Sequence, residues 1–153
     1  MFGLFKNKNE ILTRREKKRI VNLIQDIESK TSGEVRVYIE GECPFDNTMQ
    51  RAEEVFNHLG MYQTQLHNAV LLYIATESKK FAILGDTAIY DKTGNDFWQN
   101  KASSLTAHFK TGDYAEGIEI CLKEIGASLN AYFPPTGIRK NELPDDIVFG
   151  KFN

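Results

Sequence analysis

Long apolar runs, clustered cysteines and an excess of one charge are all missing from this chain of 153 residues. No apolar stretch approaches the ~18 residues of a transmembrane helix, and the apolar start of the chain is too short for a secretory leader. The formal net charge is −2, so no basic field would gather nucleic acid or an anionic membrane. The sequence therefore predicts a cytoplasmic protein with no membrane span and no nucleic-acid partner.

The sequence also gives little support for a metal or redox role of its cysteines, or for the common classes of catalytic site. Cys43 and Cys121 have no CxxC spacing and no clustered histidines beside them, which argues against structural zinc and against a disulfide scaffold. Cys121 falls on an apolar helical stripe, a position typical of an inert core thiol. Motifs of P-loops, zincins, Rossmann cofactor sites and hydrolase elbows are absent. What remains is an ordinary globular composition, 41% hydrophobic and 26% charged, long enough for one domain.

Hydrophobic periodicity predicts the element order α-β-α-β-β-α-α. Helices are expected at about 13–31, 46–60, 95–111 and 113–133, and strands at 34–41, 69–75 and 81–84. The first strand alternates polar and apolar residues and should be half-buried, whereas the second is continuously apolar and should be buried on both faces. The third follows after a short turn, so it should return antiparallel. The sequence therefore predicts one three-layer α/β/α sandwich around a small mixed sheet, with a core at about 10–133 and a tail at 134–153.

Two pairs of residues have the spacing of a helix capping box. Thr13 with Glu16 should open the first helix, and Asp113 with Glu116 should open the last. In a capping box each side chain satisfies a free backbone N–H group at the start of the helix. Both helices therefore have a predicted starting point.

Acidic side chains gather after the third strand. Asp86, Asp91 and Asp96 follow one another at steps of five residues, which is not a helical face spacing. Residues 86–96 are therefore expected to form a loop. A loop of this composition can bend several oxygens around one hard cation such as Ca²⁺ or Mg²⁺.

The predicted strand directions bring further polar residues to the same place. Because the first two strands should be parallel and the third antiparallel, the end of the third should meet the beginnings of the first two. Those beginnings carry Glu34 and Asn68, which could supply the rim of a cation site. The alternative is that the acidic residues form turns and caps, with Asn95 or Asp96 capping the third helix. The opposite end of the sheet, with Glu40 and Cys43, ranks second as a ligand site because its several carboxylates would repel an anion.

Four stretches of the chain resemble one family in their order and spacing. They are Thr31-Ser32-Gly33-Glu34, Asn68-Ala69-Val70-Leu71-Leu72, Gly85-Asp86, and Phe109 with Gly112-Asp113-Tyr114. Over about residues 10–133 the chain resembles the TPM domain. The resemblance implies an α/β/α sandwich that binds a divalent cation through acidic residues after the third strand, and a plant member is associated with acid phosphatase activity. The implied ligands here are Asp86 and Asp91, with Glu34, Asn68 and Asp96 as candidates around them.

The chain departs from the family pattern at several points. Ala69 stands where many relatives have glycine, and Ser78-Lys79 replaces an Asp-Arg pair in the hairpin turn. Many relatives also carry a signal peptide and a membrane anchor, neither of which this sequence shows. We therefore expect a stand-alone cation-binding domain, with a metal-dependent phosphatase as the alternative. A different class of function is a protein-interaction module whose tail, NELPDDIVFGKF, docks a protein partner instead of packing on its own domain.

Overall fold

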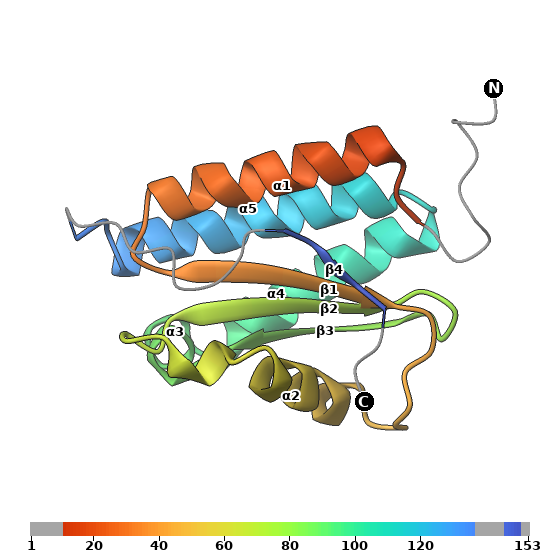
Figure 1. The fold of residues 1–153 in the computed structure, drawn as a ribbon, viewed down its shortest axis with the longest axis horizontal. Helices are drawn as coiled ribbons and strands as arrows, with labels where there is room; N and C mark the ends of the chain where they lie inside the picture. Colours follow the sequence, from red (N-terminus) through yellow and green to blue (C-terminus); the bar gives the residue numbers. More distant parts are fainter. Residues whose placement is uncertain (1–10, 137–145, 151–153) are drawn as a thin grey trace.

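The computed structural model describes residues 11–136 and 146–150. The elements are α1 (Arg14–Ser29), β1 (Glu34–Glu40), α2 (Thr48–His58), η2 (Met61–Gln63), β2 (Ala69–Ala75), β3 (Lys80–Gly85), α3 (Thr87–Thr93), α4 (Asn95–Lys110), α5 (Tyr114–Tyr132) and β4 (Val148–Phe149). All seven predicted elements are present in the predicted order, and the α/β/α sandwich is confirmed (Figure 1). Helix α3, the turn of η2 and strand β4 are additional.

The sheet is mixed and has the strand order β3-β2-β1-β4. Strands β1 and β2 are parallel, with Glu34 opposite Ala69, and are joined through α2. Strands β2 and β3 are antiparallel. Both predicted directions are therefore correct, and the end of β3 lies beside the beginning of β2, at the same end of the sheet as the beginning of β1.

Helices cover both faces of the sheet (Figure 1). Helices α1, α4 and α5 share one apolar core with a face of the sheet, which includes Ile20, Ile24, Val35, Val37, Val70, Leu72, Leu105, Ile118 and Leu122. Helix α2 covers the other face in a second core, which includes Tyr38, Ala52, Val55, Phe56, Leu71 and Tyr73. All seven residues of β1 are buried, which corrects the prediction of a half-buried strand. Its polar side chains alternate onto the face that α2 covers, where they are shielded from water.

Residues 86–96, predicted as a loop, contain the helix α3. The Asp86 side chain caps it, because Oδ1 accepts a hydrogen bond from the Thr87 amide at 2.7 Å. The spacing of five residues concealed the helix because Asp86 lies just before its first turn and Asp96 lies beyond its end. Gly94 separates α3 from α4 with φ 80° and ψ 168°. Since Gly94 is the N-cap of α4 and has no side chain, the expected cap by Asn95 or Asp96 is wrong.

Candidate metal site at one end of the sheet

Three polar residues from separate segments lie at the end of the sheet where β1 and β2 begin. Glu34 is opposite Ala69 in the parallel ladder, and Asn68 directly precedes Ala69. The Asp86 amide donates to the Ala69 carbonyl at 2.9 Å. We call Glu34, Asn68 and Asp86 the strand-end site.

All three side chains of the strand-end site are buried, with exposed fractions of 2% for Glu34, 1% for Asn68 and 3% for Asp86. Burying a carboxylate is costly unless it finds partners. Asp86 has two: the Thr87 amide, and His67, whose Nδ1 lies 3.3 Å from Oδ2. The His67 side chain is 56% exposed. The buried carboxylate is thus in contact with an imidazole at the surface.

Asn68 presents an oxygen whose partner is missing. Its Nδ2 donates to Ser32 Oγ at 3.4 Å, whereas its Oδ1 is buried and has no hydrogen-bond partner among the described residues. Buried carbonyl oxygens are nearly always satisfied in native proteins. A hard cation or an ordered water would satisfy this one. Carboxylate and amide oxygens are the ligand types that Ca²⁺ and Mg²⁺ accept, so the chemistry of these three residues suits such an ion.

The other two predicted ligands lie at the surface. Asp91 is exposed on α3, and Asp96 is exposed in the first turn of α4. The structure therefore places three of the five predicted residues at one end of the sheet, and Asp91 and Asp96 on the surface of α3 and α4. The difference arises because a helix, not a flexible loop, follows Asp86.

The family match covers both the sandwich and the strand-end site. A family model of the TPM domain matches residues 6–128. The chain belongs to the TPM domain family. The NMR structure of the BA42 protein from the psychrophilic bacterium Bizionia argentinensis is 39% identical to it, with a TM-score of 0.85, and the match covers 95% of this chain and 99% of that one. The N-terminal domain of the cg2496 protein from Corynebacterium glutamicum shares the fold at 13% identity, with a TM-score of 0.61 and coverage of 77% and 74%. No curated protein matches the chain.

A second group of ligand atoms lies at the turn between α4 and α5 of this TPM domain. One ligand atom each from His108, Asp113 and Glu116 lies within 4.8 Å of the others, with His108 partly buried and the two carboxylates exposed. We call these three residues the corner cluster. The predicted capping box at Asp113 is wrong, because its side chain makes no cap hydrogen bond and instead accepts one from Thr111 Oγ1 at 3.1 Å. The spacing of Asp113 and Glu116 was visible in the sequence, but the approach of His108 depends on the turn.

The opposite end of the sheet is occupied by a structural ion pair. Arg51 on α2 donates to both oxygens of Glu40, from Nε at 2.8 Å and from Nη2 at 2.7 Å. The Tyr73 hydroxyl also donates to Glu40, and burial together with this bond raises the pKa of Tyr73 above its ordinary value. The charge of Glu40 is therefore balanced by Arg51, and this ion pair ties α2 to the sheet. Both carboxylate oxygens already accept hydrogen bonds, so Glu40 has a structural role in this fold.

The structure also bears on the question of a membrane span. Among residues 11–136 and 146–150, none of the helices combines the length and the apolar character that crossing a bilayer requires.

Proposed function

We propose that this TPM domain binds a divalent cation, Ca²⁺ or Mg²⁺, at the strand-end site. The observation that carries the proposal is the buried Asn68 Oδ1, which has no partner among the described residues. The segment of the buried Asp86 is hydrogen-bonded through its backbone to residues 67 and 69 on either side of Asn68. Glu34, Asn68 and Asp86 would supply part of the oxygen shell, and water would complete it. Asp91 and Asp96 remain candidate ligands, and the experiment treats them separately.

The test is a titration of the ¹⁵N-labelled protein with Ca²⁺ and Mg²⁺ up to millimolar concentration. We expect amide shifts at 33–35, 67–69 and 85–88 and a higher melting temperature, because an ion that binds only the folded state stabilises it. Asp86→Asn should abolish the response. Asparagine caps helices as well as aspartate does, so this variant keeps the fold while it removes the charge.

Asp113→Asn is the matched control. It makes the same chemical change in the corner cluster, and the strand-end response should survive it. Asp91→Asn and Asp96→Asn then show whether these surface carboxylates add to the affinity. Shifts confined to 108–116, or the absence of any shift, would contradict the proposal.

A metal-dependent phosphatase is the second candidate, favoured by the contact between His67 and Asp86. An exposed imidazole whose Nδ1 lies 3.3 Å from a candidate ligand is placed where a general acid or base would be needed. A bound cation would neutralise phosphate oxygens and acidify a coordinated water. An activity assay on the same proteins tests this candidate. Hydrolysis of an aryl phosphate should stop when a chelator is added, return when the cation is restored and be absent in Asp86→Asn. Cation binding without turnover would leave a non-enzymatic cation-binding domain, the outcome we favour.

A further inference from the structure

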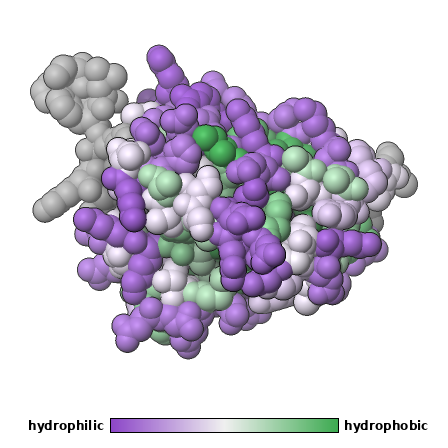
Figure 2. All heavy atoms as spheres, turned by 180° about the vertical axis from the view of Figure 1, so that it is seen from behind, coloured by the Kyte–Doolittle hydropathy of each residue, from purple (hydrophilic) through white to green (hydrophobic). Residues whose placement is uncertain are grey.

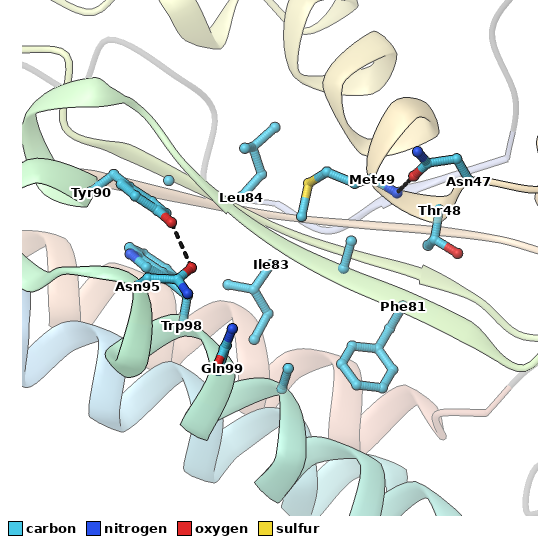
Figure 3. A pocket seen from close by; sticks show the side chains of 13 residues that line it. Asn47, Thr48, Met49, Phe81, Ile83, Leu84, Tyr90, Asn95, Trp98 and Gln99 are labelled. Atoms are coloured by element: carbon cyan, nitrogen blue, oxygen red, sulfur yellow. Dashed lines mark hydrogen bonds between the residues drawn. The ribbon is translucent and has the colours of Figure 1, made fainter.

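A groove of about 410 Å³ runs along the outer edge of β3 (Figure 3). All five residues from Phe81 to Gly85 line it. Since successive side chains of a strand point to opposite faces, a groove that touches five in a row lies at the strand's edge and not on one face. Within the described sheet β3 pairs only with β2, so its other side presents backbone N–H and C=O groups outside any ladder.

Two helix starts form the walls of this groove. Asn47, Thr48 and Met49 line one side of β3, and Tyr90, Asn95, Trp98, Gln99 and Ala102 line the other (Figure 3). The rear face of the molecule shows small apolar areas scattered between hydrophilic side chains (Figure 2). Met49 and Tyr90 are each 39% exposed. The strand edge therefore lies in a slot with large, partly exposed apolar side chains on both sides.

The residues that line the groove favour an uncharged occupant. None of the 13 lining residues carries a charge. A charged side chain entering the groove would lose hydration without gaining a counter-charge, whereas an apolar or neutral one would not. The open backbone edge in turn favours an extended main chain that can complete its hydrogen bonds.

We propose that the groove binds an extended, uncharged segment of another polypeptide, which adds to β3 as a further strand. Five residues of strand span about 17 Å at ~3.3 Å per residue, so an occupant of about five residues fills the lined edge. A second copy of the folded domain fits poorly, because its own β3 lies between the same two walls. The opposite edge of the sheet already accepts a short added strand, since β4 pairs with β1 at Tyr38 and Ile39.

Selection from a phage-displayed library of random linear peptides tests the proposal. We expect the enriched peptides to carry alternating apolar residues without charges and to shift the amides of residues 81–85. Synthetic versions N-methylated at alternate positions keep their side chains but lose backbone donors. Their affinity should fall at least about tenfold, because strand addition depends on main-chain hydrogen bonds.

Two glutamate variants separate the groove from the rest of the surface. Met49→Glu places a charge in the wall within the first turn of α2, where an acidic residue suits the helix dipole, and should weaken peptide binding at least about tenfold. Leu66→Glu makes a matched change at a residue that is 45% exposed and outside the groove, and should leave binding intact. Failure to enrich peptides, equal binding of the N-methylated forms, shifts on another surface, or self-association through residues 81–85 would each overturn the proposal.

Discussion

At the scale of single residues, burial decides the chemistry of the two free cysteines. Cys121 lies on α5 with 2% exposure, as its place on an apolar stripe predicted. Burial raises the pKa of its thiol to about 12. Cys43 is half-buried, and its Sγ lies 3.2 Å from the Phe45 carbonyl. Burial in the core therefore keeps the Cys121 thiol neutral.

The Cys121 thiol should make stability fall at alkaline pH. Its pKa in the folded state lies above the ordinary value of 9.0, so its contribution is complete below about pH 9 and is lost as pH rises toward 12. We expect the free energy of unfolding in urea to fall by about 1.4 kcal/mol more per pH unit above pH 9 than in Cys121→Ala. Equal slopes in the wild-type protein and in Cys121→Ala would show that the thiol does not titrate in this way.

The placement of the three residues of the strand-end site at one end of the sheet was predictable, because the strand directions alone determine it. Two parallel strands and an antiparallel return place Glu34, Asn68 and Asp86 at one end of the sheet, and the sequence showed both features. The corner cluster was not predictable, because His108 meets Glu116 only through the turn between α4 and α5. The Glu40–Arg51 pair was missed for a similar reason, since it joins a strand to a helix whose relative rotation the sequence does not determine.

At the scale of elements, α3 shows why a short helix escaped the sequence. Its seven residues, TAIYDKT, include two threonines and an isoleucine, which have modest helix propensity. The helix is held by tertiary contacts instead, since Ile89 is 1% exposed within the main core. A pattern of one buried residue in two turns is too sparse to reveal a helical period.

Gly94 ends α3 and precedes α4, and its backbone conformation should not tolerate a side chain. Its φ of 80° and ψ of 168° fall in a region almost confined to glycine. Among the described residues, no atom beyond Gly94 and its two chain neighbours lies within 4 Å of the position a Cβ would take, so the cost is conformational. Gly94→Asn should lower the free energy of unfolding by about 1–3 kcal/mol, measured by urea denaturation.

Gly60→Asn is the control for that variant. Gly60 has φ 71° and ψ 22°, the left-handed helical region that asparagine also adopts. The loss there should stay below about 1 kcal/mol. Equal losses at the two glycines would contradict the distinction between these backbone regions.

At the scale of the whole molecule, the C-terminal segment completes the sheet of its own domain. Ile147 is 5% exposed and belongs to the main core. The Gly150 amide donates to Ile39 O at 3.0 Å, and the Tyr38 hydroxyl donates to Gly150 O at 2.6 Å. For residues 146–150 these contacts favour self-packing over docking to a partner, while residues 137–145 and 151–153 of the predicted tail lie outside the described part. The apolar residues were visible in the sequence, but a strand of two residues has no period from which its pairing could be predicted.

Truncation after Pro135 should therefore destabilise the domain. Exposing the site of Ile147 and losing the hydrogen bonds of Gly150 should lower the free energy of unfolding by about 2–5 kcal/mol. Thermal and urea unfolding measure the loss. Ile147→Ala should reproduce much of it, whereas Phe149→Ala, at a residue that is 47% exposed, should cost less than about 1 kcal/mol. If the truncated chain unfolds like the full one, the contacts of β4 contribute nothing to the fold, and the segment would then be free to serve a partner.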